Sequence, residues 1–497
     1  MAVSVVREDL LPFAPQSLST SANTYLRGVG MGDNAAMVLH WLALIEHELL
    51  LFAGFFFLLG ALDELSMDFT WFWLRLTGRA QTPVISRRDI RHRQLSGRAA
   101  VLVPTWQEAR VIADTLTHAL SVWPQENLRI YVGVYRNDPE TLEAAARAAQ
   151  GDRRVRIVVH DRDGPSTKAD CLNCLYVAMQ QDELREGRKA RMVLLHDAED
   201  MVDAAALSLL DHAIGKAQFV QLPVLPMPRG DARWIGSHYC EEFAEAHGKS
   251  MVVRNALGTS LPAAGVGCAF ERRILSDIAQ RSGRNIPFDE DSLTEDYELG
   301  IKVAAMGGTS RFLRVRGGDG HLVATRAYFP DQLGHAVRQK ARWMHGIALQ
   351  GWDRLGWTGG PGEWWMRLRD RRGPLSAVVL FTGYTLMVLA LLLAGMKAGG
   401  LAVPWQPSGL LTALLAFNLA SFAWRAFMRF NFTKAEYGWR EGLRAVLRIP
   451  VANVISIMAG YRALFAYGRS LRGEALQWEK TAHDIHPARA VVVEPAQ

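Results

Sequence analysis

The sequence predicts an α/β domain attached to α-helical transmembrane segments. Between residues 98 and 360, short apolar runs rich in β-branched residues alternate with helical patterns, which is typical of a parallel sheet. Residues 375–396 contain no charged side chain, and an apolar run of that length can cross a bilayer. The 15 tryptophans, many of them near the ends of apolar runs, fit the aromatic belts of membrane proteins. The chain has 497 residues, which leaves room for both parts.

The overall composition narrows the class of protein. The net charge is +6, from 56 Lys and Arg against 50 Asp and Glu, so the excess is modest. We expect no nucleic-acid partner. Four cysteines are too few for a disulfide framework. No apolar run follows a basic start near the N-terminus, so we expect no signal peptide.

Three apolar segments are predicted to span the membrane, at residues 38–66, 375–398 and 408–429. The first contains Glu46 and Glu48, which we place near the outer interface because charges at the bilayer centre are costly. The alternative is that all three segments are buried core helices of a soluble protein.

Basic residues predict the orientation of these segments. Seven arginines lie between residues 75 and 98, directly after the first segment, whereas residues 1–36 hold only Arg7 and Arg27. Lys and Arg favour the cytoplasmic side. We therefore expect a tail outside (1–37), a basic linker (67–97), and the α/β domain (98–360) and C-terminal region (430–497) in the cytoplasm.

Two further segments are predicted to lie on the cytoplasmic membrane surface. The first, residues 361–374, carries tryptophans with arginines between them. The second is a helix over 449–466, whose apolar stretch of 13 residues ends at Arg462. As a helix that stretch covers about 20 Å, too short to span. The alternative for both is an ordinary helix packed against the domain.

Within the α/β domain, strands are predicted at 99–106, 128–135, 155–160 and 190–195. Sites in parallel sheets form at the carboxyl ends of the strands. Asp138 follows the second of these strands, and Asp197, Glu199 and Asp200 follow the fourth. Three carboxylates in four residues favour a hard divalent cation, Mg²⁺ or Mn²⁺, that shares its ligands with phosphates. The alternative is an acidic helix N-terminus.

Other polar residues extend this candidate site. Asp296, in the triplet Thr294-Glu295-Asp296, is a candidate general base, although the triplet also fits a simple helix cap. Lys168 and Asp170 lie in the first turn of a predicted helix, where a ligand's base or phosphate can bind. That loop is equally a common connection, and we interpret Cys171 and Cys174 as packing residues.

A basic helix offers the opposite wall of the site. In "RQKARWMHG", residues 338–346, Gln339, Arg342 and Trp343 share one helical face. An arginine suits a diphosphate, and a tryptophan offers a flat face to a sugar. The alternative is a basic helix against anionic lipid.

The order of four motifs resembles a family 2 glycosyltransferase of the membrane polysaccharide-synthase type. The motifs are Asp138, "DAED" (197–200), "TED" (294–296) and Gln339-x-x-Arg342-Trp343. Longer stretches of the sequence resemble the phage-adsorption protein B family of inner-membrane glycosyltransferases. The similar stretches, which span about residues 50–485, are "LLGALDEL", "NDPET", "KADCLN", "HDAED", "ATRAYFP", "ARWMHGIALQGW" and "LQWEKTAHD".

The resemblance implies a GT-A fold, with a Rossmann-like mixed sheet, that transfers a nucleotide-activated sugar with inversion. It implies that Asp138 contacts the nucleoside and that Asp296, next to Glu295, is the base. The remaining implied roles are diphosphate and metal binding by Asp197, Glu199 and Asp200, diphosphate and acceptor-end binding by Gln339, Arg342 and Trp343, and close approach of the acceptor at Gly265 and Gly267.

The resemblance also implies a setting: a multi-pass protein of the bacterial inner membrane that extends an exopolysaccharide or other glycan. The donor it suggests is a UDP-linked N-acetylhexosamine, and a further expectation is an export partner in the periplasm or outer membrane. Alternatives are a single transfer to a polyprenyl phosphate and a non-catalytic envelope scaffold. Two features depart from the family. "YRND" replaces a paired Asp-Asp, and the chain ends at Gln497 without a cyclic di-GMP-binding domain, so direct control by that nucleotide is not expected.

Overall fold

The computed structural model describes residues 33–231, 233–399, 408–474 and 484–491. The chain divides into two compact units, Met1–Leu62 with Val379–Phe422, and Asp63–Val378 with Ala423–Gln497. Most of the expected N-terminal tail (1–37), the end of the C-terminal region and nearly all of "LQWEKTAHD" lie outside the described residues.

A seven-stranded mixed sheet forms the centre of the second unit, in the order β4-β3-β2-β5-β8-β6-β9. The first four strands are parallel, whereas β8 is antiparallel to both of its neighbours and β9 is parallel to β6. The sheet confirms the predicted Rossmann-like α/β class. The strands are β2 (Arg98–Pro104), β3 (Leu128–Tyr135), β4 (Val155–His160), β5 (Ala190–Leu195), β6 (Phe219–Gln221), β8 (Cys268–Glu271) and β9 (Ser310–Phe312).

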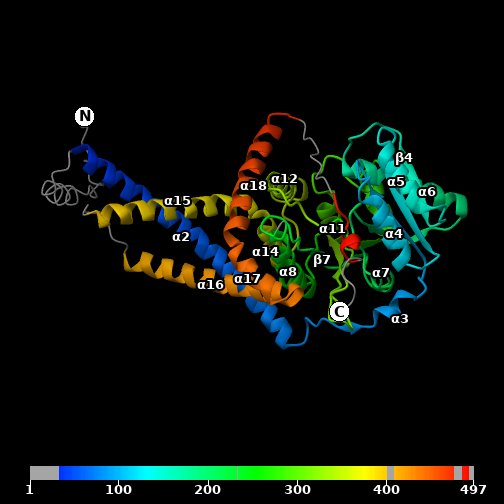
Figure 1. Ribbon diagram of the computed structural model, residues 1–497, viewed down its shortest axis with the longest axis horizontal. Helices are drawn as coiled ribbons and strands as arrows, with labels where there is room; N and C mark the ends of the chain where they lie inside the picture. The colour runs from blue at the N-terminus through cyan, green and yellow to red at the C-terminus, as the bar shows by residue number, and fades with distance from the viewer. Residues whose placement is uncertain (1–32, 232, 400–407, 475–483, 492–497) are drawn as a thin grey trace, which may run out of the picture. The chain divides into compact units, whose positions relative to one another are not determined.

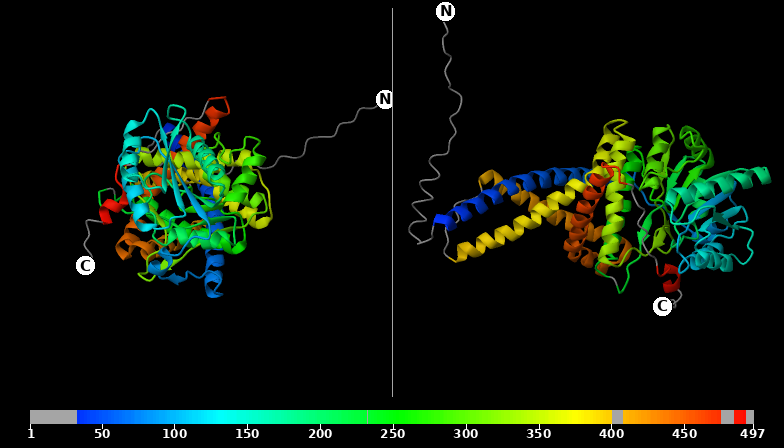
Figure 2. Two further views of the ribbon diagram at one scale, coloured as in Figure 1. Left: turned by 90° about the vertical axis from the view of Figure 1, so that its right-hand side faces the viewer. Right: turned by 90° about the horizontal axis from the view of Figure 1, so that it is seen from above.

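Helices cover both faces of this sheet (Figures 1 and 2). Alternate residues of a strand point to opposite faces, so Val101 of β2 lies in one core cluster and Leu102 in the other. The first cluster includes side chains of α4 (Ile112–Val122), α5 (Pro139–Ala149) and α7 (Ala206–Ile214). The second includes side chains of α6 (Lys168–Glu186), α10 (Arg272–Arg281) and α11 (Glu295–Ala305).

Local capping fixes where the helix nearest the site begins and ends. Thr167 precedes α6, and its side chain accepts a hydrogen bond from the Asp170 backbone N–H at 3.1 Å. At the other end, Gly187 takes the left-handed conformation with φ 64°, which glycine adopts without steric cost. The cap therefore places Lys168 in the first turn, directly beside the strand ends.

Smaller elements complete the second unit. Two short parallel pairs join β1 (Val84–Ile85) to β10 (Arg316–Gly317) and β7 (Val224–Pro226) to β11 (Thr325–Ala327). The other helical elements are α3 (Arg87–Arg91), α8 (His238–Glu245), the π-helical turn η2 (Ala246–Ser250), α9 (Met251–Leu257), α12 (Leu333–Trp343), the π-helical turn η3 (Met344–Gln350), α13 (Gly351–Leu355), α14 (Pro361–Arg371), α17 (Trp439–Leu447) and α19 (Pro487–Val491).

In the part of the chain that the structure describes, four helices are long and apolar enough to cross a membrane: Met37–Leu76 of α2 (Asp33–Leu76), α15 (Gly373–Ala398), α16 (Gly409–Tyr437) and α18 (Ile449–Ser470). Three of them contain the predicted spans. The helix α2 continues ten residues past the expected end at residue 66. The expected surface segment 361–374 comprises α14 and the start of α15, and its position on a membrane stays a prediction.

The length argument for the fourth helix was wrong. The apolar stretch was expected to be too short to span because it stops at Arg462, but α18 runs through Arg462 to Ser470 and has 22 residues, about 33 Å. One of its faces is covered by protein, because Ile455, Ala459 and Ala463 pack into a cluster with residues of α12.

Within the first unit, small residues allow close contact between apolar helices. A Cβ atom at Gly54 of α2 would lie 2.9 Å from the Leu414 side chain of α16, and the Asn418 side chain of α16 donates a hydrogen bond to the Gly54 carbonyl at 3.0 Å. Gly383 of α15 similarly faces Phe57 of α2. Close backbone approach of this kind is a common way for membrane helices to associate.

At the start of the second unit, the carboxylates of α2 meet cations of the domain. Lys249 of η2 is almost fully buried, and its ammonium lies 2.7 Å from Asp68 and 3.4 Å from Glu64. Arg369 donates to Glu64 at 2.9 Å, and the Trp365 indole donates to Asp63 at 2.6 Å. Charges buried in this way require such partners.

Candidate active site

The site is built where four parallel strands end. Thr105, Arg136, Asp161 and His196 are the first residues after β2, β3, β4 and β5, so the loops that follow leave from the same edge of the sheet. Two short acidic stretches contribute to this edge, residues 196–200 after β5 and the start of α11. This is the edge at which sheets of this type bind ligands.

Lys168 is the centre of the charge cluster. Its ammonium lies 2.6 Å from a carboxylate oxygen of Asp197. Burial lowers the pKa of Lys168, but the charges of Asp197, Glu295 and Asp296 outweigh burial and raise that pKa well above its usual value. The cluster therefore joins residues that lie about 100 positions apart along the chain, as the sequence predicted.

Asp296 lies in the first turn of α11, with Gly265 directly against its carboxylate. A Cβ atom at position 265 would lie 2.1 Å from Oδ2 of Asp296, so only glycine fits there without displacing the acid. The Tyr297 backbone N–H donates to the other oxygen at 2.7 Å. Burial raises the pKa of Asp296, and the charge of Lys168 opposes that shift.

The neighbouring Glu295 is more deeply buried. Burial and the negative charge of Asp296 raise the pKa of Glu295 to about 7. Its Oε1 atom is buried and has no hydrogen-bonding partner among the described residues. Two adjacent acids with raised pKa values are typical of groups that exchange protons near neutral pH.

The basic helix α12 reaches the same cluster. The positive charge of Arg342 lowers the pKa of both Glu295 and Asp296, which places its guanidinium near them. Gln339 is half-buried, and its Oε1 atom lacks a hydrogen-bonding partner within the described ranges. Arg342 therefore lies near the two acids, whereas the place of Gln339 in the site and the ligands of both residues stay predictions.

Trp343 lies in an aromatic cluster rather than on an open face. Its ring meets Tyr239 edge-on at 5.9 Å between centroids, and Phe243 and Phe329 lie within 6.4 Å of it. The side chain remains half-exposed. This packing orients the indole and leaves part of it exposed, while a role in acceptor binding stays a prediction.

The carboxylates of the acidic loop after β5 lie in two different environments. Asp200 is 2% exposed and turns inward, where it accepts hydrogen bonds from His196 Nδ1 at 2.8 Å and from the Asp197 backbone N–H at 3.0 Å. Burial raises the pKa of Asp200. Asp197 and Glu199 are half-buried instead. The loop therefore uses Asp200 to hold its own shape.

These residues fit a divalent cation of the predicted type. Among the described residues, no three His, Cys, Asp or Glu side chains lie close enough together to hold a metal by themselves. Mg²⁺ and similar ions bind through one or two carboxylates, with water and substrate phosphate completing the shell. Asp197 and Glu199 can supply those carboxylates, whereas Asp200, which was also predicted as a ligand, is engaged elsewhere.

Two predicted donor-binding acids make local contacts. Asp170 faces β4, and one of its carboxylate oxygens lies 3.2 Å from His160 Nε2. Lys168 and Asp170 are two positions apart on α6, so their side chains leave the helix in directions about 200° apart. Asp138 caps α5 and accepts hydrogen bonds from the backbone N–H groups of Gln107 at 2.5 Å and Thr141 at 3.4 Å. Contact of either acid with a donor stays a prediction.

Sequence reasoning missed an aromatic wall beside these acids. Trp106 meets Tyr135 edge-on at 5.2 Å, and Tyr135 stacks on His160 at 5.0 Å between ring centroids. These rings stand at the ends of β2, β3 and β4. The signal was present, because Tyr135 and His160 end β3 and β4, and Trp106 is the second residue after β2.

Gly267 allows a close backbone approach to β11 and does not contact the acid cluster. Its φ is 60°, and a Cβ atom there would lie 2.4 Å from Oγ1 of Thr325. The glycine therefore allows the segment before β8 to pass close to β11. Gly265 and Gly267 were both predicted beneath the acceptor, and the structure brings Gly265 alone of the two against Asp296.

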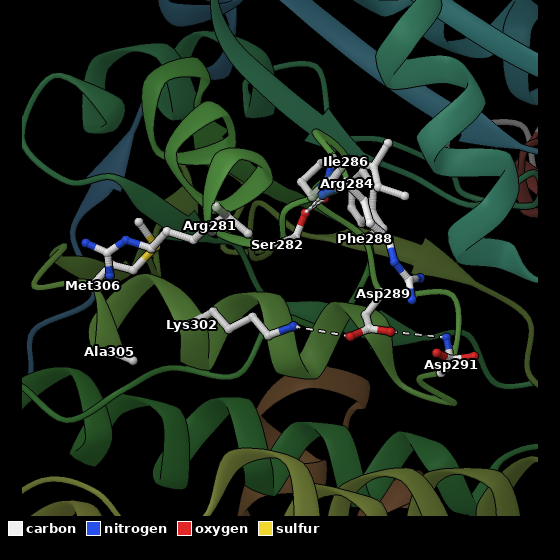
Figure 3. Close-up of a pocket in the computed structure, with 12 residues that line it drawn as sticks. Arg281, Ser282, Arg284, Ile286, Phe288, Asp289, Asp291, Lys302, Ala305 and Met306 are labelled. Atoms are coloured by element: carbon white, nitrogen blue, oxygen red, sulfur yellow. Dashed lines mark hydrogen bonds and ion pairs between the residues drawn. The ribbon is translucent and has the colours of Figure 1, made fainter.

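A cavity of about 390 Å³ lies between α10, the loop after it and α11 (Figure 3). Arg281, Arg284 and Lys302 line it, and Lys302 lies 4.0 Å from Asp289. None of the predicted site residues lines this cavity. The acid cluster, with its perturbed carboxylates, is therefore the candidate active site.

The chain is similar to curated proteins along most of its length. Bacteriophage adsorption protein B of Escherichia coli (strain K12) is 32% identical over 453 residues, which cover 86% of this chain and 60% of that protein. Bacteriophage N4 adsorption protein B of Escherichia coli O157:H7 gives the same values. The chain thus spans about 60% of the length of these relatives. The predicted resemblance to protein B is confirmed.

Solved structures show weaker likeness. The mannosyltransferase PcManGT from Pyrobaculum calidifontis, in complex with GDP-Man and Mn²⁺, is 18% identical with a TM-score of 0.48, covering 86% of this chain and 99% of that one. TarS (residues 1–349) of S. aureus is 12% identical with a TM-score of 0.35, covering 76% and 92%. Neither is near enough to indicate a donor or a metal for this chain.

A family model described as glycosyltransferase like family 2 matches residues 97–346, just over half of the chain. The match begins at the first strand of the central sheet and extends beyond Trp343 of α12. It contains Lys168, Asp197, Asp296 and Arg342, the charged residues that the structure gathers at the strand ends. The chain therefore belongs to this family and is a glycosyltransferase.

Proposed function

We propose that the chain transfers a sugar from a nucleoside diphosphate to a hydroxyl of a glycan, with inversion at the anomeric carbon. The observation that carries the proposal is the gathering of Lys168, Asp197, Asp296 and Arg342 from four separate elements around one point. Such a set offers a base on one side and cations for a departing diphosphate on the other.

In this mechanism, Asp296 accepts the proton of the acceptor hydroxyl as its oxygen attacks the anomeric carbon. The bond between that carbon and the diphosphate oxygen breaks, and the diphosphate leaves with the bonding electrons. Lys168 and Arg342 face the negative charge that develops on it. A divalent cation, held by Asp197 and Glu199, supplies further charge neutralisation when bound.

The aromatic wall supports the choice of a nucleotide donor. Of its three rings, Trp106 is half-exposed at the end of β2, whereas Tyr135 and His160 are buried behind it and hold it in place. A planar base binds by stacking on such a ring. We assign the nucleoside to this wall, the diphosphate to the Lys168 side of the site, and the acceptor to the side of Gly265 and Trp343.

The finer assignments follow the resemblance to the protein B relatives. We propose a UDP-linked donor, an N-acetylhexosamine as the sugar and a growing exopolysaccharide as the acceptor. We also propose a multi-pass arrangement in a bacterial inner membrane, with the catalytic unit in the cytoplasm and an export partner in the envelope. Reporter fusions at residues 360 and 403 test this topology, because opposite compartments are expected for the two.

Release of UDP by the purified full chain tests the activity. We expect release with Mn²⁺ and at least one UDP-sugar, and a loss of about 10²-fold or more in Asp296→Asn, because the base is removed. Asp277→Asn, a half-buried acid on α10 outside the site, is the matched control and retains activity.

The alternatives give different results in this assay. A single transfer to a polyprenyl phosphate yields one product of fixed size on a gel, whereas a polymerase yields a ladder. A non-catalytic scaffold releases no UDP from any donor, and that result would end the proposal.

A further inference from the structure

A row of three residues on one helical face meets the segment that carries Asp296. Gly346 and Gln350 belong to η3 and Arg354 belongs to α13, and these elements continue α12 without a gap in the chain. Residues four positions apart lie on one face of a helix, so the three point in similar directions. None of them was predicted from the sequence as a site residue. We call Gly346, Gln350 and Arg354 the stripe.

Gln350 binds the backbone just before Asp296 through both ends of its side-chain amide. Its Oε1 atom accepts a hydrogen bond from the Leu293 backbone N–H at 3.1 Å, and its Nε2 atom donates to the Asp291 carbonyl at 3.3 Å. Two bonds from one planar amide fix both the distance and the orientation of the segment that they hold. The half-buried Gln350 side chain therefore holds the backbone on either side of Ser292.

The other two members of the stripe contact the ends of the same segment. A Cβ atom at Gly346 would lie 2.5 Å from Oγ1 and 2.7 Å from Cγ2 of Thr294, so the helix backbone lies directly against that side chain. Arg354 donates to Oε1 of Glu298 at 2.7 Å and also pairs with Asp289. The contacts of the stripe therefore extend from residue 289 to residue 298.

Further hydrogen bonds link this segment to the start of α11. The Thr294 carbonyl accepts from the Glu298 backbone N–H at 3.2 Å, which closes the first turn of the helix. The Ser292 hydroxyl accepts from the Thr294 backbone N–H at 3.3 Å and donates to Oε1 of Glu298 at 2.8 Å. Glu298 is 1% exposed, so these bonds are shielded from water. Asp296 lies within this turn, and its carboxylate moves when the turn moves.

We propose that Gln350 is a positioning residue, and that the stripe sets where α11 begins and so holds the Asp296 carboxylate in place for the acceptor. The inference rests on the proposed function, because the position of Asp296 matters in this way only if Asp296 is the base. A misplacement of about 1 Å in a reacting group costs about 10²-fold in rate. Loss of one of the three contacts shifts the turn by less than that, so we expect an effect of about tenfold.

Replacement of Gln350 by methionine tests the inference on the purified full chain. Methionine has nearly the same length as glutamine and removes both hydrogen bonds. We expect kcat for UDP release to fall about tenfold. The KM for the donor stays near the wild-type value, as does UDP binding with Mn²⁺ in calorimetry, because Lys168 and Asp197 are untouched.

Gln218 provides the matched control. It is half-buried like Gln350, and its Oε1 atom accepts hydrogen bonds from the Thr309 backbone N–H at 2.7 Å and from the Thr309 hydroxyl at 3.0 Å. Thr309 follows α11, whereas the residues that Gln350 binds precede that helix. Gln218→Met therefore removes comparable bonds at the end of α11 that is far from Asp296, and we expect it to keep the wild-type kcat.

Gly346→Ala moves the same turn without removing a hydrogen bond. Alanine is favoured over glycine in a helix, so the collision with Thr294 is the main effect, and we expect kcat to fall while the donor KM stays unchanged. Thr294→Ala removes Oγ1 and Cγ2, the two atoms nearest to the new Cβ, and Oγ1 has no hydrogen-bonding partner among the described residues. We expect the double variant to regain kcat relative to Gly346→Ala, which general damage to the fold would not allow.

The outcomes separate the inference from the proposed function. Wild-type kcat in both Gln350→Met and Gly346→Ala would overturn the inference while leaving the proposed function standing. An equal loss of kcat in Gln218→Met, or a loss of UDP binding as large as the loss of kcat, would overturn it too. If Gln350→Met does not fold, Gly346→Ala and its double variant decide, and a double variant no faster than Gly346→Ala counts against the inference. If the wild-type chain releases no UDP from any donor, the proposed function fails and the inference fails with it.

Discussion

Replacement of Gly265 by alanine is the sharpest test of the catalytic role of Asp296. The new Cβ would lie 2.1 Å from Oδ2, 3.0 Å from Cγ and 3.3 Å from Cβ of Asp296. A carbon and an oxygen that are not bonded stay more than about 3 Å apart, so the carboxylate must retreat by about 1 Å. Its charge and its hydrogen-bonding partner are unchanged, and only its position moves.

A displacement of about 1 Å in a reacting group costs about 10²-fold in rate, or about 2.7 kcal/mol of transition-state stabilisation. We therefore expect kcat for UDP release to fall by about 10²-fold in Gly265→Ala. The KM for the donor stays near the wild-type value, because Lys168 and Asp197 are untouched. Initial rates over a range of donor concentrations separate the two effects.

Backbone strain must be separated from the collision with Asp296. Gly265 has φ 75°, a conformation that costs alanine about 1 kcal/mol in any setting. Gly187, at the end of α6, has φ 64°, and a Cβ atom there meets nothing within 4 Å. Gly187→Ala therefore carries the strain alone. The reasoning is refuted if Gly265→Ala folds and keeps kcat within twofold of wild type, or if Gly187→Ala loses as much activity.

Three further predictions follow from the site and the domain around it. First, kcat/KM falls at low pH as Asp296 gains its proton, with an apparent pKa above that of an ordinary aspartate because burial raises the pKa of Asp296. Lys168→Met removes a charge that lowers this pKa, so we expect the acidic limb of the pH profile to move to higher pH. An acidic limb that stays in place would contradict the assignment of Asp296. Second, EDTA weakens UDP binding in calorimetry and added Mn²⁺ restores it, whereas equal affinity with and without EDTA would exclude a cation at Asp197 and Glu199. Third, Arg448→Met removes the 2.8 Å partner of the buried Glu241, which keeps Arg429 at 3.3 Å, and we expect the free energy of unfolding to fall by about 1.5–3 kcal/mol. Arg448→Met with Glu241→Gln recovers much of the melting temperature, and no recovery would show that Arg448 acts through packing.

The sequence predicted the parts of the fold that local patterns encode. The β-branched runs became β2, β3, β4 and β5, because parallel strands buried on both faces are continuously apolar. Parallel strands end at one edge, which explains why Asp197, after β5, faces the site. That Asp296 and Arg342 lie near it was expected from the resemblance that the ordered motifs carry.

Other features depend on contacts that no local pattern records. The orientation of Asp200 follows from His196, and that of Asp170 from His160 on a neighbouring strand. The helix α18 ends at Ser470, four residues past the predicted end at 466, and one of its faces packs against α12. The burial of His486 depends on α4, more than 360 positions earlier in the chain.

The cluster of charges around Lys249 has a consequence for the N-terminal helix. Each residue of an α-helix turns it by about 100°, so one inserted residue between Asp63 and Asp68 would swing Asp68 away from the ammonium it meets at 2.7 Å. An insertion before Asp63 would leave every one of these bonds in place. The rotational phase of α2 within the second unit is thus set at Asp63, Glu64 and Asp68.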